Sequence, residues 1–61
     1  MRKAITAKYY DIHGKLLWTE PYIFERRYAE GDEFVREYKG YLVIESILLG
    51  NKYIVKVENV E

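Results

Sequence analysis

The 61-residue chain contains no cysteine, and this absence excludes several kinds of chemistry. Without a thiol the protein forms no disulfide, offers no thiolate to a metal ion and has no cysteine nucleophile. The lack of cysteine is typical of a reducing compartment, so we expect a cytoplasmic protein. A chain of this length has room for one hydrophobic core, and we expect residues 1–61 to form a single domain.

Histidine and serine each occur only once, as His13 and Ser46. His13 falls in a predicted turn, where a polar side chain is solvated, and a zinc site would need further ligands. Ser46 has no plausible histidine base, so nucleophilic catalysis of the usual kind lacks its components. The acidic cluster of Asp32, Glu33 and Glu37 supplies too few oxygens for a calcium loop. We therefore predict a protein without enzymatic activity, metal ion or cofactor.

The sequence also lacks an excess of either charge and any long hydrophobic run. Ten lysines and arginines balance ten acidic residues, whereas nucleic-acid-binding domains usually carry a basic excess that neutralises phosphates. A net charge of zero lowers the expectation of a nucleic-acid partner and eases association between copies. The longest apolar runs, "YLVI" and "ILL", are too short to cross a bilayer, so we expect no membrane partner.

What the sequence does contain begins with a hairpin signal, "YYDIHGKLLW". Asp11 suits the first position of a type I turn, because its carboxylate accepts a hydrogen bond from a nearby backbone N–H. Gly14 can then adopt the left-handed conformation that closes the hairpin. Residues before the turn alternate between apolar and polar, as in a half-buried strand. We predict strands at 2–10 and 15–24.

A second hairpin is predicted in "YLVIESILLGNKYIVKVENV". Gly50-Asn51 forms a two-residue loop that matches the twist of two strands, which we place at 41–49 and 52–60. In the last strand Tyr53, Val55 and Val57 are predicted to share one face, with Ile54, Lys56 and Glu58 on the other. The apolar alternation of the partner strand breaks at Ser46. A β-bulge near Glu45-Ser46 would turn both apolar sets, Leu42 with Ile44 and Ile47 with Leu49, toward the core.

The segment between the hairpins has two interpretations. A helix across 21–38 would place apolar side chains at a 4-7-3 spacing and would contain good helix formers. Gly31-Asp32 opposes that helix, because glycine costs about 1 kcal/mol relative to alanine and aspartate prefers a cap. The other interpretation makes Gly31-Asp32 a turn, followed by a strand at 33–38 that turns back across Lys39-Gly40.

A resemblance favours the second interpretation. The run "EGDEFVREYKGYLVIESI", followed by "YIVKVENV", resembles small β-barrel proteins of the SH3-like kind, many of them encoded by phages and prophages. The resemblance implies an all-β fold: five antiparallel strands in a meander, closed as an SH3-like barrel. The alternative is an α+β arrangement, ββαββ, with its helix at 21–38.

Two candidate surfaces follow from tyrosines and arginines. Seven tyrosines exceed what so small a core can hide, so we expect several to be exposed, and Tyr and Arg are favoured in protein interfaces. We predict a protein partner or a homodimer, bound through Tyr10, Tyr22, Arg26, Arg27 and Tyr28. The alternative is a barrel that binds single-stranded nucleic acid. Its surface would be Arg26, Arg27, Arg36, Tyr38, Lys39 and Tyr41.

Overall fold

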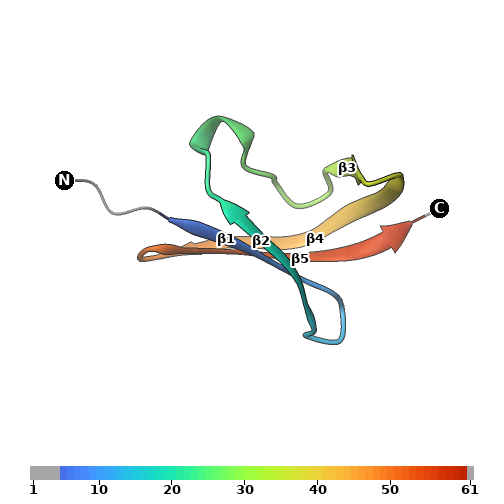
Figure 1. Cartoon of the computed structure of the whole chain (residues 1–61), viewed down its shortest axis with the longest axis horizontal. Coiled ribbons are helices and arrows are strands. Elements are labelled where there is room, and N and C mark those ends of the chain that lie inside the picture. Colours follow the sequence, from blue (N-terminus) through green and yellow to red (C-terminus); the bar gives the residue numbers. More distant parts are fainter. Residues whose placement is uncertain (1–4, 61) are drawn as a thin grey trace.

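Five β-strands form one curled sheet in the computed structural model, which describes residues 5–60 (Figure 1). The strands are β1 (Thr6–Tyr10), β2 (Leu16–Pro21), β3 (Glu33–Arg36), β4 (Lys39–Leu49) and β5 (Lys52–Val60). A short 3₁₀ helix, η1 (Phe24–Arg26), interrupts the connection between β2 and β3. The order across the sheet is β2-β1-β5-β4-β3. The predicted all-β class with five strands is confirmed.

The pairing of the strands corrects two details of the expected barrel. Pairs β1–β2, β3–β4 and β4–β5 are antiparallel, but β1 and β5 are parallel, so the sheet is mixed. The reason is topological: when five successive strands alternate in direction, the first and the fifth run the same way. No pairing joins β2 to β3. The curled sheet is therefore a half-barrel, open along the seam between these two strands, and the prediction of an antiparallel, closed barrel is wrong.

The first hairpin forms as its turn residues predict. The Asp11 Oδ1 atom accepts hydrogen bonds from the backbone N–H groups of His13 (2.8 Å) and Lys15 (2.9 Å), and Gly14 has a φ of 87°. The predicted strand at 2–10 is observed from Thr6 onward, and its first three positions lie outside the described residues. The partner strand ends earlier than the predicted 15–24, because the chain leaves the sheet just after Pro21 and turns into η1.

The central segment is extended, and the alternative helix across 21–38 is wrong. The only helical turn there is η1, which has three residues. Gly31 has a φ of 93°, which ends any helix and suits a turn. The Asp32 carboxylate accepts a hydrogen bond from the N–H of Ala29 at 2.7 Å, and the Asp32 N–H donates to the Ala29 carbonyl at 3.0 Å. The predicted Gly31-Asp32 turn is thus confirmed.

The turn between β3 and β4 lies two residues before its predicted place at Lys39-Gly40. Glu37 and Tyr38 form it, with φ values of 50° and 69°, and the strand predicted at 33–38 ends correspondingly early. Gly40 serves another purpose inside β4. A Cβ atom there would lie 2.9 Å from the Val60 carbonyl oxygen, so the glycine permits a close approach to β5.

The second hairpin has the predicted Gly50-Asn51 loop, and its bulge falls at Ile44, between Val43 and Glu45. This phase differs from the prediction. It places Val43, Ser46 and Leu48 opposite the buried residues Val57, Val55 and Tyr53, respectively. The apolar residues predicted to face the core, Leu42 with Ile44 and Ile47 with Leu49, are not buried, and Ile47 and Leu49 are exposed.

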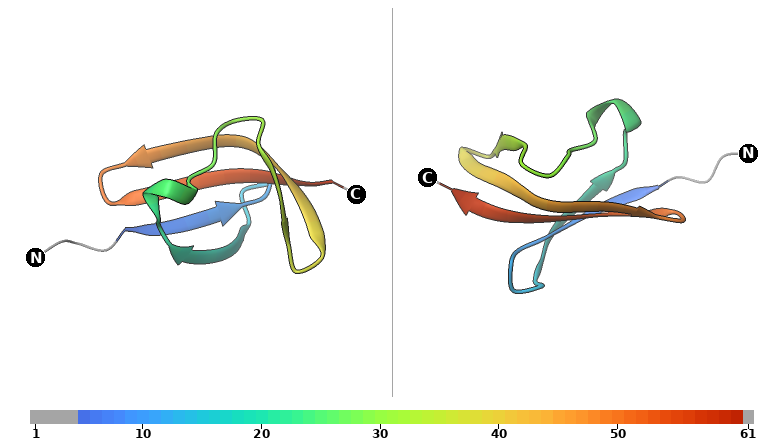
Figure 2. Two further views of the ribbon diagram at one scale, coloured as in Figure 1. Left: turned by 90° about the horizontal axis from the view of Figure 1, so that it is seen from above. Right: turned by 180° about the vertical axis from the view of Figure 1, so that it is seen from behind.

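The sheet curls around a concave side (Figure 2), and aromatic rings pack against the buried core. The buried core comprises Ala7, Tyr9, Val43, Tyr53, Val55 and Val57, so the three residues predicted to share one face of β5 are all buried. The Tyr9 ring stacks on Trp18 with the ring centroids 4.7 Å apart, and the Tyr28 ring stacks on Phe34 at 4.4 Å. These rings bring residues from opposite edges of the sheet into one layer. They pack across the seam that backbone pairing leaves open.

Candidate functional site

Tyr53 holds the connection between β2 and β3 against the sheet. Its hydroxyl accepts a hydrogen bond from the Tyr28 N–H at 2.9 Å and donates one to the Tyr28 carbonyl at 2.8 Å. The Ser46 hydroxyl also donates to that carbonyl at 2.8 Å. A connection without regular structure must find such partners for its backbone. Both backbone groups of Tyr28 are therefore fixed to β4 and β5.

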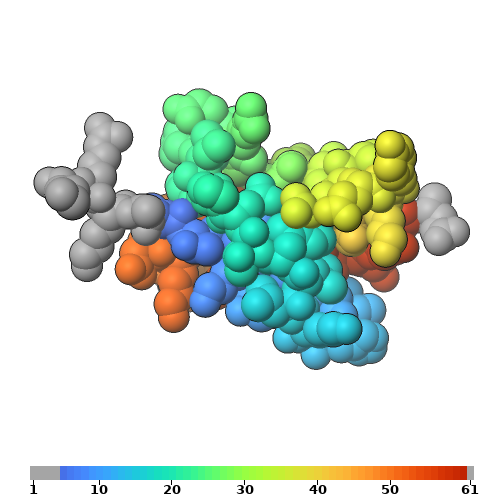
Figure 3. Space-filling view, viewed as in Figure 1, coloured from blue at the N-terminus to red at the C-terminus, as the bar shows by residue number. Residues whose placement is uncertain are grey.

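A second attachment fixes the end of the same connection. The Gly31 N–H donates to the Val43 carbonyl at 2.8 Å, and the Val43 N–H donates to the Asp32 carbonyl at 2.7 Å. Figure 2 shows the connection passing over one face of the sheet, and in Figure 3 its green atoms stand above the strands. The segment that carries η1 is consequently a positioned loop, from which side chains project into solvent.

Two of these exposed side chains are large and apolar. Ile23 and Phe24 have exposed fractions of 44% and 59%. The Arg27 guanidinium lies over the Phe24 ring, 3.9 Å from its centroid, and Nη1 donates to the Phe24 carbonyl at 3.2 Å. This cation–π contact and hydrogen bond fix the ring without covering it. Phe24 is thus an exposed aromatic ring whose position is fixed by Arg27.

A groove of about 530 Å³ separates the η1 turn from the β4–β5 hairpin. Its lining includes Phe24, Arg27 and Tyr28 on one side and Ile47 and Leu48 on the other. We name it the Phe24 groove. Ile47 and Leu48 are both exposed, so exposed apolar residues belong to both sides of the groove. Clustered exposed apolar residues on a small protein are a common mark of an interaction site.

The structure brings four of the five predicted partner-binding residues together in this region. Arg26 ends η1, and Tyr22, Arg27 and Tyr28 lie within two residues of it, whereas Tyr10 ends β1 beside the first hairpin turn. Both arginines are exposed, and neither pairs with a carboxylate among residues 5–60. Two guanidinium groups without a carboxylate partner in the described part of the chain thus lie on the same short turn as the exposed Phe24 ring.

The tyrosines of this set, expected to be exposed, are partly buried, and Tyr22 and Tyr28 pack against the core. The Tyr22 ring packs 4.7 Å from the ring of Tyr53, and the Tyr28 ring stacks on Phe34. Burial, followed by the charge of Glu20, raises the pKa of the Tyr28 hydroxyl. These two rings attach the loop to the core. The exposed apolar residues are Ile23, Phe24 and Leu48, which sequence reasoning missed although "YIF" directly precedes the two arginines.

Residues of the alternative nucleic-acid surface lie in three places. Arg26 and Arg27 lie at η1, where Arg27 but not Arg26 lines the Phe24 groove. Tyr38, Lys39 and Tyr41 line a different groove at the other end of the sheet. Arg36 lies at the open seam, where three contacts within the chain engage its guanidinium. It lies over the Trp18 ring, 4.6 Å from the centroid, and pairs with Glu20 at 3.2 Å and with Glu37 at 3.9 Å.

His13 and Ser46 are the residues of the sequence that metal binding or nucleophilic catalysis would use. His13 is exposed in the hairpin turn, and the Ser46 hydroxyl is engaged with the Tyr28 carbonyl. Within residues 5–60, no three or more histidine, cysteine, aspartate or glutamate side chains are grouped as a metal site requires. No helix in that range has the length and apolar character needed to cross a membrane.

Comparison with known proteins adds no family to this description. No family model matches the chain, and neither the curated proteins nor the solved structures searched include a significant match.

Proposed function

We propose that the protein is a non-enzymatic protein-binding module. Its partner would be a protein segment that places an apolar side chain in the Phe24 groove and a carboxylate near Arg26 and Arg27. The observation that carries the proposal is the exposed Phe24 ring, clamped by Arg27 on a loop that Tyr53 fixes to the sheet. A preorganised aromatic anchor beside arginines is typical of the centre of a protein interface.

Charge favours an acidic protein segment over a nucleic-acid strand as the partner. Two unpaired arginines attract carboxylates and phosphates alike. However, Glu30 and Glu45 also line the Phe24 groove, and Glu25 lies in η1. A continuous phosphate backbone would have to pass these carboxylates. A protein segment with one or two acidic residues avoids them.

The proposal extends to the type of fold and to the biological setting. Five strands in sequence order, curled around an aromatic core, support an SH3-like module, although the parallel β1–β5 pair and the open seam depart from a closed antiparallel barrel. We further propose a phage or prophage accessory protein that acts in the cytoplasm. The support for this setting is the cysteine-free sequence and the resemblance of its second half to small phage barrels.

Selection from a random peptide library displayed on an unrelated carrier tests the proposed chemistry. We expect the enriched peptides to share an aromatic or large aliphatic residue next to aspartate or glutamate. Phe24→Ser and the double variant Arg26→Ser with Arg27→Ser should each weaken binding of such a peptide at least about tenfold. Val35→Ser is the matched control, because Val35 is 75% exposed on β3 and lies outside the groove, and it should leave binding unchanged.

The salt dependence of binding separates the two classes of partner. A peptide held mainly by apolar contact should lose only a few-fold in affinity between about 50 and 200 mM salt, whereas a strand held through many phosphates loses far more. Oligo(dT) is the comparison ligand. Selected peptides without a shared apolar–acidic pattern, or tighter and steeply salt-dependent binding of oligo(dT), would overturn the proposal.

A further inference from the structure

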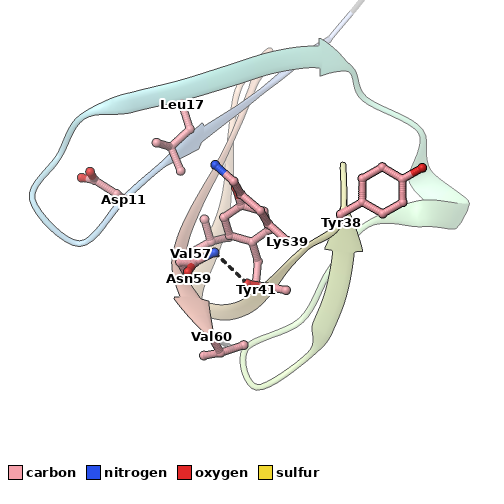
Figure 4. Close-up of a pocket in the computed structure, with 9 residues that line it drawn as sticks. Asp11, Leu17, Tyr38, Lys39, Tyr41, Val57, Asn59 and Val60 are labelled. Carbon is pink, nitrogen blue, oxygen red and sulfur yellow. Dashed lines mark hydrogen bonds between the residues drawn. The ribbon is translucent and has the colours of Figure 1, made fainter.

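The larger groove of the protein lies at the opposite end of the β4–β5 ribbon from the Phe24 groove (Figure 4). It is open, has a volume of about 810 Å³, and separates the β1–β2 hairpin from the β3–β4 turn. Its lining includes Asp11, Leu17, Lys39, Tyr41, Val57 and Val60. Because Val57 is fully buried and belongs to the core, we name this feature the Val57 groove.

Tyr38 lies at the rim of the Val57 groove. It is fully exposed, and in Figure 4 its ring points away from the other labelled side chains. The two turn residues, Glu37 and Tyr38, both have left-handed backbone conformations. A two-residue loop of this kind favours Asn-Gly, so local preference does not explain a tyrosine at its second position. A fully exposed aromatic ring thus lies next to an open groove of mixed polar and apolar lining.

We propose that a second copy of this chain occupies the Val57 groove, forming a two-fold symmetric dimer in which the Tyr38 ring of each copy enters the groove of the other. The projection and the groove are adjacent on one face of the molecule. A two-fold axis near the rim therefore places both rings in grooves simultaneously, which closes the assembly at two copies. This surface is separate from the Phe24 groove, so the inference does not depend on the proposed partner binding.

The charges of the Val57 groove are complementary under the same two-fold operation. Asp11 and Lys39 lie on opposite walls, and neither forms an ion pair with another described residue. Hydrogen bonds from the backbone N–H groups of Lys15 and His13 favour the ionised form and lower the pKa of Asp11. In the dimer, Lys39 of each copy faces Asp11 of the other. The net charge of zero adds no repulsion between copies.

Apolar surface beside the groove would be covered by the same association. Ile12 and Leu16 lie in the β1–β2 hairpin next to the groove residue Leu17, and all three side chains are exposed. A chain of this size buries only about 60% of the surface of its unfolded state, so an interface that buries more apolar area is favourable. The hairpin therefore supplies a rim of apolar contacts around the Tyr38 ring.

Sedimentation velocity from about 10 µM to about 1 mM protein tests the dimer. We expect the average mass to rise from that of one chain toward that of two. Tyr38→Gly should weaken association at least about tenfold, because it removes the projecting ring while glycine accepts the left-handed backbone. Circular dichroism confirms that the variant remains folded. Lys39→Glu should also weaken association at low salt, with a smaller effect near about 0.5 M salt.

Two controls separate this dimer from other kinds of association. Lys52→Glu makes the same charge change at the start of β5, far from the Val57 groove, and should leave the dimer intact. Phe24→Ser should leave it intact as well. A chain that stays monomeric throughout the concentration range would overturn the inference. Association that persists unchanged in Tyr38→Gly, or that Phe24→Ser abolishes, would overturn it too.

Discussion

The hydroxyl group of Tyr53 makes two hydrogen bonds to the backbone of one residue. It accepts from the Tyr28 N–H at 2.9 Å and donates to the Tyr28 carbonyl at 2.8 Å. A side chain of the core thereby satisfies both backbone groups of a residue 25 positions earlier in the chain. The loop that carries η1 has a fixed position because of this relationship. The surface that we propose for partner binding depends on it.

Tyr53→Phe tests the importance of this anchor. The substitution keeps the ring but removes the hydroxyl, leaving the Tyr28 N–H without its partner. We expect the free energy of unfolding, measured with urea, to fall by about 1–3 kcal/mol. Tyr41→Phe is the matched control, because the Tyr41 hydroxyl makes no hydrogen bond to another described side chain or backbone group, and it should change stability by less than about 0.5 kcal/mol. Equal effects of the two variants would contradict the anchoring role.

Arg36 and Glu20 connect the two edges of the sheet that backbone pairing leaves apart. Their side chains are 38% and 40% exposed, so solvent weakens the attraction between them. A double-mutant cycle with Arg36→Gln and Glu20→Gln should give a coupling of about 0.2–1 kcal/mol that decreases with added salt. Trp18, the only tryptophan, lies under the Arg36 guanidinium and reports the transition by fluorescence. Zero coupling at low salt would show that the seam is closed by aromatic packing alone.

Gly40→Ala tests the close approach of β4 to β5. The new Cβ atom would lie 2.9 Å from the carbonyl oxygen of Val60, a backbone atom that moves only if the strand moves. We expect a loss of about 1–3 kcal/mol in the free energy of unfolding, as for other overpacked sites. Val35→Ala, at the position paired with Gly40 on β3, is the control and should have little effect. An unchanged unfolding midpoint in Gly40→Ala would contradict the proposed reason for this glycine.

Alkaline pH should destabilise the fold through its buried tyrosines. Burial, followed by the charge of Glu20, raises the pKa of the Tyr9 hydroxyl, and burial likewise raises that of Tyr28. Above about pH 10 the unfolded chain loses these protons while the folded chain retains them, so stability should fall as pH rises. The urea midpoint between pH 8 and pH 11 measures this loss. Tyr9→Phe should flatten the decline, and a slope identical to that of the unmodified protein would contradict this cause.

Local turn chemistry explains the parts of the fold that the sequence predicts. Asp11 with Gly14, Gly31 with Asp32, and the Gly50-Asn51 loop each act through their own backbone or that of near neighbours. Contacts between distant segments explain the failures. The parallel β1–β5 pair joins the two ends of the described chain. The sequence predicts Gly40 as a turn residue, whereas the reason for this glycine is the close approach of Val60.

The candidate site was predicted only where sequence neighbours suffice. Arg26 and Arg27 are neighbours in the chain, so their grouping could be predicted from the sequence. The partial burial of Tyr22 and Tyr28 could not be predicted from the sequence, because it depends on how aromatic rings from separate segments pack together. Phe24 was missed for the same reason. Its exposure follows from a turn that points away from a core that other rings already fill.

The most direct test of the proposed function is a nuclear magnetic resonance titration of the ¹⁵N-labelled protein with a selected apolar–acidic peptide. We predict that the largest amide shift changes occur at residues 23–28 and at Ile47 and Leu48, on the two sides of the Phe24 groove. Shift changes confined to the seam between β2 and β3, or to the Val57 groove, would contradict it.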